Sequence, residues 1–317
     1  MNVWVNFLID SLAFGAVFMY GSTGEILTEK VGHLNLGIPG IMCMGGAGGC
    51  LMLNFIGKSS LPGFLIVILG ILGSLAFSML MGAIYSFLTV TLRANQNVTG
   101  LALTTFGVGL MKVIFSKLDA TIYLVGPKQL YRWPFAGRTD ALQYLGVLFF
   151  LAVIIAIVAS IVLYRTKVGL HLRAVGENPG TADAVGINVT RYKYAATCIG
   201  SGLAGLGGFY YIIDFMASQE AYLSIEAFGW LSIALVIFAL WRPHMTILGS
   251  TVFGFLFSCS SYIANIPGIT VTMAAKPILK MLPYVVTILV LIVTSIRNKR
   301  ENQPPMSLGL PYFREER

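Results

Sequence analysis

The chain has 317 residues, of which 56% are hydrophobic and 11% are charged, and its formal net charge is +8. A soluble domain carries about 25% charged residues, so this composition excludes a water-soluble protein and predicts an integral membrane protein. The positive charge does not indicate nucleic-acid binding. The basic residues lie in loops between apolar runs, where membrane proteins concentrate them on the cytoplasmic side.

Long uncharged runs predict an all-α, polytopic helical bundle with about nine membrane spans. The predicted spans cover residues 3–24, 37–56, 63–91, 98–116, 142–164, 191–213, 228–241, 246–263 and 282–296. The pair that flanks residues 241–244 is short, and short or broken spans are tolerated where they line a cavity. Together the spans form one membrane domain over residues 1–297. The polar tail over residues 298–317 is predicted to be disordered or to lie against a partner.

Small and polar residues mark the starts of the second and fourth spans. Asn35 is suited to bond the backbone at a helix break, and Gly37 and Gly40 allow another helix to approach closely. Asn97 and Thr99 offer hydrogen bonds at the start of the fourth span. Two roles fit these residues. They cap and pack helices, or they line a pathway for a neutral polar solute, which they meet without the cost of a buried charge.

A polar segment of small residues, from about 166 to 190, separates the fifth and sixth spans. Asn178 is suited to cap a helix, Pro179 suits the first helical position, and Gly186 can end the element after about two turns. The sequence therefore predicts a short surface helix at the end of two spans. Two interpretations fit the spacing: a solvated loop that caps the spans, or a docking surface for a soluble motor.

The loop charges favour one orientation. With residues 166–190 on the cytoplasmic side, alternation of the spans places the N-terminus outside, the C-terminus inside, and 13 of the 21 Lys and Arg residues inside. Four acidic residues then lie at or near the outer ends of spans: Asp10, Asp214, Glu220 and Glu226. No carboxylate is predicted at mid-depth, which argues against the ion relay of a secondary transporter.

Motifs for bond chemistry are missing from the sequence. Residues 200–205 match the dinucleotide pattern GxGxxG, but they lie in an apolar segment, where closely spaced glycines serve helix packing. No GxxxxGK[ST] nucleotide loop occurs, so an ATP-driven transporter would need another chain to bind ATP. The four cysteines are expected to be structural free thiols and the three histidines to be interfacial or solvated at cytoplasmic span ends, with no metal site and no cofactor bound by this chain.

Several stretches carry a family resemblance. They are the segment 166–190, residues 25–42 with Asn35-x-Gly37-x-x-Gly40, residues 95–104, residues 234–243, residues 281–284 and residues 307–316. In order and spacing they resemble permease subunits of bacterial ABC importers for nucleosides and simple sugars, within the branched-chain amino acid and ribose-type permease superfamily. The family more often has an acidic residue where this chain has Pro39.

The resemblance implies a permease in the bacterial cytoplasmic membrane that catalyses no bond chemistry. It implies three protein partners: a second homologous permease, a cytoplasmic ABC ATPase that binds ATP and Mg, and an extracytoplasmic substrate-binding lipoprotein. The ATPase-coupling residues it indicates are Arg173, Ala174, Gly176, Glu177, Asn178, Pro179, Ala182, Ala184 and Gly186. The alternatives are a secondary transporter or facilitator that acts alone and, more remotely, a membrane enzyme.

Overall fold

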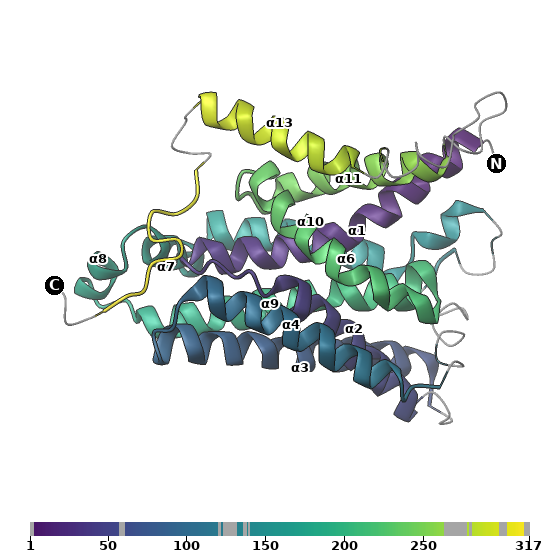
Figure 1. The fold of residues 1–317 in the computed structure, drawn as a ribbon, viewed down its shortest axis with the longest axis horizontal. Coiled ribbons are helices and arrows are strands. Elements are labelled where there is room, and N and C mark those ends of the chain that lie inside the picture. The colour runs from purple at the N-terminus through teal and green to yellow at the C-terminus, as the bar shows by residue number, and fades with distance from the viewer. Residues whose placement is uncertain are drawn as a thin grey trace.

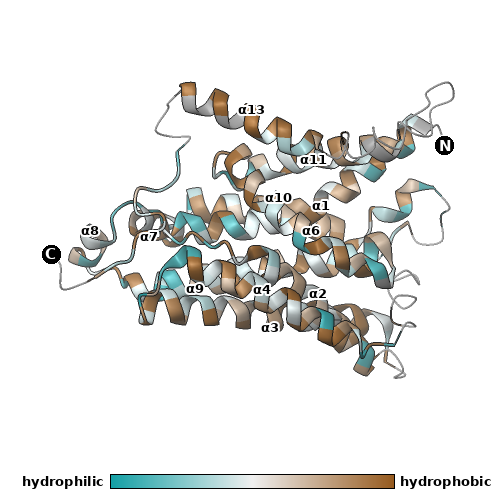
Figure 2. Ribbon diagram, in the orientation of Figure 1, coloured by the Kyte–Doolittle hydropathy of each residue, from teal (hydrophilic) through white to brown (hydrophobic). Residues whose placement is uncertain are grey.

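The computed structural model describes residues 3–56, 61–119, 122, 132–135, 138, 140–262, 278, 281–297 and 303–313. Regular structure in these residues is helical throughout, without a strand (Figure 1). The predicted all-α class is therefore confirmed. The long helices run between two ends of the molecule, and Figure 2 shows hydrophobic residues spread along their lengths.

The long helices follow the predicted spans closely. They are α1 (Val3–Lys30), α2 (Ile38–Ile56), α3 (Gly63–Ser86) with the π-helical η1 (Phe87–Thr91), α4 (Gln96–Phe115), α6 (Val147–Arg165), α9 (Val189–Tyr210) with the π-helical η3 (Tyr211–Met216), α10 (Ile225–Phe238), α11 (Pro243–Tyr262) and α13 (Leu282–Arg297). The short helices are η2 (Ala141–Tyr144), α7 (Lys167–Glu177), α8 (Pro179–Ala184) and η4 (Gln219–Ser224).

Seven of the described helices, counting π and 3-10 extensions with their α-helices, are long and apolar enough to cross a membrane. They comprise α1, α2, α3, α4, α6, α9 and α10. The apolar part of α11 is shorter, and α13 has 16 residues. The exact number of nine spans therefore stays a prediction.

Glycines set the close packing at the centre of the bundle. A Cβ atom added at Gly45 in α2 would lie 2.3 Å from the Cα atom of Gly205 in α9. One added at Gly24 in α1 would lie 2.2 Å from the carbonyl oxygen of Gly200. The glycines that mimic a dinucleotide motif thus bring α9 against both α1 and α2, as the packing interpretation predicted.

The first helix is longer than the sequence predicted. It continues to Lys30, because its end is set by Gly32, which has a φ of +88°. Gly32 N donates to Glu29 O at 2.8 Å and His33 N donates to Thr28 O at 3.2 Å, the paired bonds of a Schellman motif. The predicted end at residue 24 was wrong, since hydropathy falls before the helix stops.

Because α1 continues, two carboxylates that lie beyond the end of the predicted first span are buried. Glu25 and Glu29 are 0% and 3% exposed. Asn35 N donates to Glu25 Oε1 at 3.2 Å, and the indole N–H of Trp241 donates to Glu29 Oε2. At the opposite end of the bundle Asp214 is also fully buried, 3.7 Å from the guanidinium of Arg132. Buried acidic groups are therefore more numerous than the sequence analysis expected.

Candidate coupling site

Helices α7 and α8 project from one end of the bundle, between the ends of α6 and α9 (Figure 1). The hydroxyl of Thr166 accepts from Gly169 N at 3.1 Å and caps α7. Asn178 has an extended backbone between the two helices, and its Oδ1 accepts from Thr181 N at 3.0 Å. Pro179 stands at the first turn of α8, and Gly186 follows it with a φ of +87°. The predicted short helix is confirmed, and α7 is an addition that sequence reasoning missed.

Apolar side chains fix these two helices to the bundle. Leu172 and Val175 of α7 and Ala182 of α8 are at most 7% exposed. They belong to a cluster with Ile26, Leu163, Val189 and Trp241. This cluster joins the ends of α1, α6, α9 and α10 beneath α7 and α8. A movement of α7 would therefore act directly on the ends of several long helices.

The contact between α7 and α1 is a backbone contact. A Cβ atom added at Gly176 would lie 2.2 Å from the carbonyl oxygen of Lys30 and 3.4 Å from Gly32 N. Only glycine allows this approach. Gly176 thus sets the distance between the last turn of α7 and the end of α1.

Residues 303–313, which we call the strap, cross the same end of the molecule. Ser307 N and Ser307 Oγ both donate to Gly176 O, at 3.1 and 2.5 Å. Gly309 N donates to Gly32 O at 3.2 Å, and Tyr312 OH donates to Asp183 Oδ2 of α8 at 2.9 Å. The strap therefore lies against its own chain. For these residues the disordered alternative was wrong, and contact with a partner stays a prediction, while 298–302 and 314–317 lie outside the described residues.

Gln96, at the start of α4, links the strap to the α1–α2 connection. Its Oε1 accepts from Leu34 N at 2.8 Å, and its Nε2 donates to Leu310 O at 3.3 Å. Nearby, the Arg93 guanidinium carbon lies 4.9 Å from the ring centroid of Phe313. Gln96 lies in the stretch 95–104 that the sequence analysis singled out, but its two partners could not be predicted, because they are backbone groups that carry no side-chain signature.

The predicted coupling residues divide into buried and exposed sets. Gly176 and Ala182 are buried, and Arg173, Ala174 and Pro179 are half-buried. The exposed members are Glu177, Asn178, Ala184 and Gly186. Beside them Val185 is 71% exposed, an apolar side chain left uncovered at the end of α8. The arrangement offers a docking surface on α8, and the ATPase-coupling role of these residues stays a prediction.

The predicted pathway residues lie mostly inside helix contacts. Asn35 is 0% exposed, and its Oδ1 accepts from Gly37 N at 2.9 Å. A Cβ atom at Gly40 would lie 2.5 Å from Leu103 O, so α2 and α4 touch backbone to backbone there. Thr99 is buried and Asn97 is exposed. Lining of a solute pathway by these residues stays a prediction.

A buried polar cluster surrounds the α1–α2 connection. Glu25 Oε2, His33 Nε2 and Asn35 Nδ2 are buried without a hydrogen-bond partner among the described residues. His33 Nδ1 lies 2.8 Å from the hydroxyl of Thr197. Burial, with the nearby charge of Lys193, holds the pKa of His33 well below its ordinary value. The expectation of an interfacial or solvated histidine was therefore wrong at this position.

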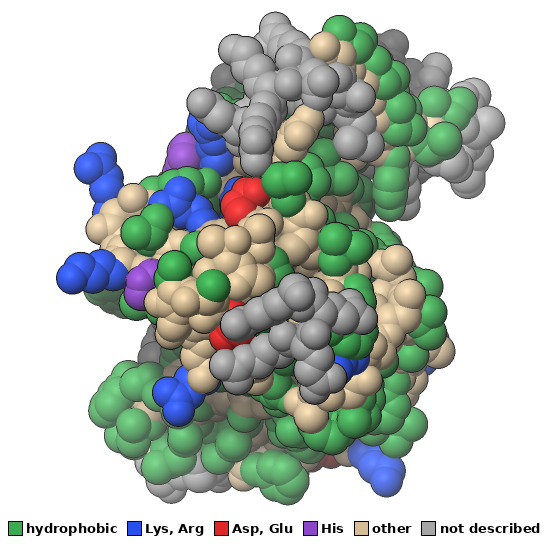
Figure 3. Space-filling model, turned by 90° about the vertical axis from the view of Figure 1, so that its left-hand side faces the viewer, with side chains coloured by type: hydrophobic (Ala, Val, Ile, Leu, Met, Phe, Trp, Pro, Cys, Tyr) green, Lys and Arg blue, Asp and Glu red, His purple; other side chains and the backbone are tan. Residues whose placement is uncertain are grey.

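Basic side chains gather at the end that carries α7 and α8. Figure 3, which faces that end, shows Lys, Arg and two His side chains along one side of it. The described basic residues at this end are Lys30, Arg93, Arg165, Lys167, Arg173, Arg191, Lys193 and Arg242, and those at the other end are Lys112, Lys117, Arg132 and Arg138. A metal-binding group of His, Cys, Asp or Glu does not occur in the described part of the chain.

Known proteins resemble this chain over most of its length. TsgC13 of Haloferax volcanii, named provisionally as a glucose ABC transporter permease protein, is 32% identical, with 81% of this chain and 77% of that protein covered. The nucleoside ABC transporter permease protein NupC of Lactococcus lactis is 32% identical, with 89% and 90% covered. The guanosine ABC transporter permease protein NupQ of Bacillus subtilis is 28% identical, with 97% and 96% covered.

A solved structure supports the fold. A metal-chelate type ABC transporter in an inward-facing conformation aligns with a TM-score of 0.50 and 15% identity, over 92% of this chain and 85% of that one. Residues 7–293 match the family described as branched-chain amino acid transport system, permease component. With its helices, its α7–α8 projection and these matches, the chain belongs to that family of transport permeases.

Proposed function

We propose that this chain is the membrane-spanning permease subunit of an ATP-driven nucleoside importer. The observation that carries the proposal is the α7–α8 projection, which is held to α1 by Gly176 and to the strap by Ser307. Nucleosides are the proposed solute because NupC and NupQ are named for nucleosides and guanosine. The similarity to this chain extends over nine-tenths or more of the length of each of these two proteins. Simple sugars are the second candidate, from the name of TsgC13.

The proposed importer has four kinds of component. This chain pairs with a second homologous permease, and a substrate-binding lipoprotein delivers solute from outside. An ABC ATPase, which binds ATP and Mg, docks on the exposed surface at the end of α8, formed by Ala184 and by Val185 and Gly186 directly after the helix. The end that carries α7 and α8 is then cytoplasmic, with the N-terminus outside and the C-terminus inside the bacterial cytoplasmic membrane. The excess of basic residues at that end supports this orientation.

Coupling follows from the contacts of α7 and the strap. When the ATPase moves α7, Gly176 pushes or pulls on the end of α1, and Ser307 carries the same displacement into the strap. The strap passes it to the α1–α2 turn through Gly309 and to α4 through Gln96. Two discrete arrangements of these packed elements would correspond to outward-open and inward-open states.

The buried carboxylates give the rival function a specific basis. Glu25, Glu29 and Asp214 are each at most 3% exposed, and such groups mark ion sites in secondary transporters. Each, however, already faces a donor or a cation: Asn35 N, the Trp241 indole and the Arg132 guanidinium. We therefore assign them to holding helix ends together.

Reconstitution distinguishes these functions. The complex is purified through this chain, placed in proteoliposomes with its binding protein, and tested with labelled guanosine, cytidine and glucose. The expected result is nucleoside uptake that requires ATP on the ATPase side and is abolished when the ATPase cannot hydrolyse it. Uptake that follows a proton or sodium gradient without ATP would contradict the importer, and ATP-dependent uptake of glucose alone would assign the sugar instead.

A further inference from the structure

A cavity of about 620 Å³ lies at the start of α9. Four segments line it: η1 with Arg93 beyond its end, residues 183 and 186–188 at and after the end of α8, the first turns of α9, and Tyr312 of the strap. The basic side chains in its lining are those of Arg93, Arg191 and Lys193, and the described carboxylate is that of Asp183. The cavity therefore connects the segment after α8 with both α9 and the strap.

Lys193 has the property that points to a ligand. Its side chain is 3% exposed, but it forms no hydrogen bond and no ion pair within the described part of the chain. No described carboxylate acts on its charge either. The titratable group that senses this charge is His33, a base rather than an acid. A buried cation is stable only when an anion or another hydrogen-bond acceptor faces it.

The carboxylate of Asp183 does not neutralise this lysine. Its Oδ2 accepts from Tyr312 OH at 2.9 Å, and no ion pair joins it to a described basic side chain of the cavity. Arg93 faces an aromatic ring instead, with its guanidinium carbon 4.9 Å from the ring centroid of Phe313. Each basic side chain of the cavity thus lacks a carboxylate partner among the residues that the structure describes.

The start of α9 adds backbone donors to the same cavity. A helix leaves the N–H groups of its first turn without partners inside the helix, and Asn188 Oδ1 accepts from one of them, Arg191 N, at 2.9 Å. Val189 and Thr190, the first two residues of this 22-residue helix, line the cavity. The dipole of a long helix favours an anion at this end. Lys193 follows one turn later on the same helix.

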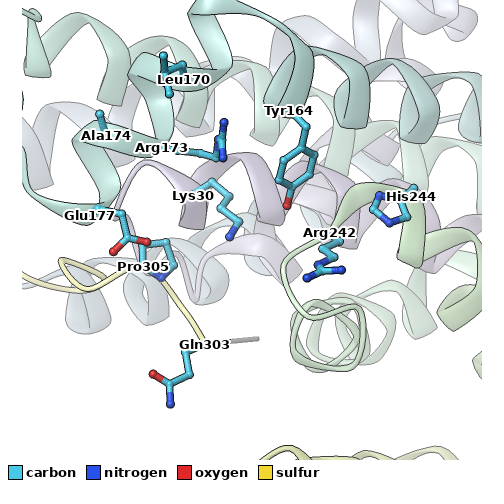
Figure 4. Close-up of a pocket in the computed structure, with 10 residues that line it drawn as sticks. All are labelled: Lys30, Tyr164, Leu170, Arg173, Ala174, Glu177, Arg242, His244, Gln303 and Pro305. Carbon is cyan, nitrogen blue, oxygen red and sulfur yellow. The ribbon is translucent and has the colours of Figure 1, made fainter. Parts of the chain in front are cut away.

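A second cavity at this end of the molecule differs in its charges. Figure 4 shows Lys30 and Glu177 in that cavity, which lies beside α7. Glu177 and Glu29 both act on Lys30 with the opposite charge, so this lysine has counter-charges in its own chain. Lys193 has no such counter-charge among the described residues. The cavity at the start of α9 is therefore the stronger candidate for an anion site.

We propose that the cavity at the start of α9 binds a phosphate-bearing anion. The phosphate oxygens face the ammonium of Lys193 and the N–H groups of the first turn of α9, and Arg93 contributes a further cation at the rim. A volume of about 620 Å³ lies in the range of small-molecule sites, roughly 300–1,000 Å³, and leaves room for an organic group on the phosphate.

Two sources share this phosphate chemistry. The headgroup of an anionic phospholipid could enter from the membrane surface, because the cavity lies at the ends of α3 and α9. A soluble phosphate compound could enter from the aqueous side. In either case the anion touches the segment after α8 and Tyr312 of the strap. Its effect on coupling to the ATPase rests on the proposed function, whereas the binding itself does not.

The test uses the full-length chain in nanodiscs of phosphatidylcholine. Sodium pyrophosphate is titrated at constant ionic strength, and the thermal unfolding midpoint is followed. The wild type is expected to be stabilised saturably. Lys193→Met keeps the apolar part of the side chain and removes the unpaired cation. It should unfold at the same or a higher temperature than the wild type without pyrophosphate, and its half-saturating concentration should rise at least tenfold.

Arg93→Asn is a second variant, because asparagine tolerates the positive φ of 56° at this position. It should raise the half-saturating concentration severalfold. The matched control is Arg165→Gln, which removes one exposed charge at the same end, outside the cavity, and should respond like the wild type. Equal responses of all variants to pyrophosphate would overturn the proposal, as would a loss of stability in Lys193→Met with its pyrophosphate response intact.

A second arm separates the two sources. Nanodiscs that contain phosphatidylglycerol are analysed for lipid that stays bound to the purified chain. Retention of this lipid by the wild type and its loss in Lys193→Met would assign the lipid. A saturable pyrophosphate response without lipid retention would assign the soluble anion. If neither anion binds, and the purified ATPase stabilises the wild type but not Lys193→Met, the proposal is overturned in favour of a protein carboxylate.

Discussion

Replacing Gly176 with alanine tests the contact between α7 and α1 directly. The added Cβ would lie 2.2 Å from Lys30 O, 3.0 Å from Lys30 C and 3.4 Å from Gly32 N. All three are backbone atoms, so no side chain can rotate away, and α7 must withdraw by about 1 Å to restore ordinary contact. Overpacking of this kind costs about 1–3 kcal/mol, and the withdrawal also stretches the two hydrogen bonds from Ser307 to Gly176 O.

The expected result is a chain that inserts normally, unfolds several degrees lower and loses most of its uptake per ATP hydrolysed. Thermal unfolding in nanodiscs and paired uptake and ATPase assays on the reconstituted complex measure both effects. Gly109→Ala in α4 is the matched control, because a Cβ there meets nothing within 4 Å. Its stability should be unchanged or slightly higher, since alanine favours helix over glycine by about 1 kcal/mol. Equal losses in both variants, or wild-type behaviour of Gly176→Ala, would refute the reasoning.

Tyr312→Phe removes the hydrogen bond to Asp183. The variant should lose about 1 kcal/mol of stability and show a lower ratio of uptake to ATP hydrolysis. Both quantities are compared with those of Phe313→Leu, which keeps that bond. Cysteines at Val185 and Ser116, in a chain without its native cysteines, should react with an impermeant maleimide from opposite sides, Ser116→Cys from outside; labelling of both from one side would overturn the orientation. Burial lowers the pKa of His33, so the unfolded chain takes up a proton at a higher pH than the folded chain does. The stability of the wild type should therefore fall as the pH drops below about 6.5, and that of His33→Gln should fall less. Parallel pH profiles of unfolding for the two chains would exclude this role. Asn35→Ala and Asn97→Ala should reduce uptake or change solute preference with ATP hydrolysis intact, and unchanged uptake of several nucleosides would remove both from the pathway.

The sequence predicted the membrane bundle well, because hydropathy reports directly on burial in lipid. It also predicted α8, since Asn178, Pro179 and Gly186 each act within a few residues of chain. The end of α1 was misplaced. Residues 25–30 are polar enough to suggest a turn, while the structure keeps them helical by burying Glu29 against the Trp241 indole, 212 residues away in sequence. Such a partner is invisible to a local pattern.

The strap could not be predicted for a different reason. Its anchors are the backbone carbonyls of Gly176 and Gly32, reached by Ser307 and Gly309. Every residue offers a backbone carbonyl, so no residue type signals these pairs. A polar segment with several prolines therefore looks like a free tail in the sequence. Its hydrogen bonds can form only once α7, the α1–α2 turn and α4 are in place.

Through these contacts, the α1–α2 connection would pass the proposed displacement of α7 on to several helices. Leu34 donates its backbone N–H to Gln96 and accepts from Tyr85 OH through its carbonyl at 2.7 Å, so one residue of the connection binds both α4 and α3. Asn35, next in the chain, is bound to Glu25 of α1. A movement of α7 that shifts Gly32 must therefore carry α3 and α4 with it or break these bonds, each worth about 1 kcal/mol. The α3 and α4 helices are thus coupled to a movement of α7 through the α1–α2 connection, as a permease moved from one end requires.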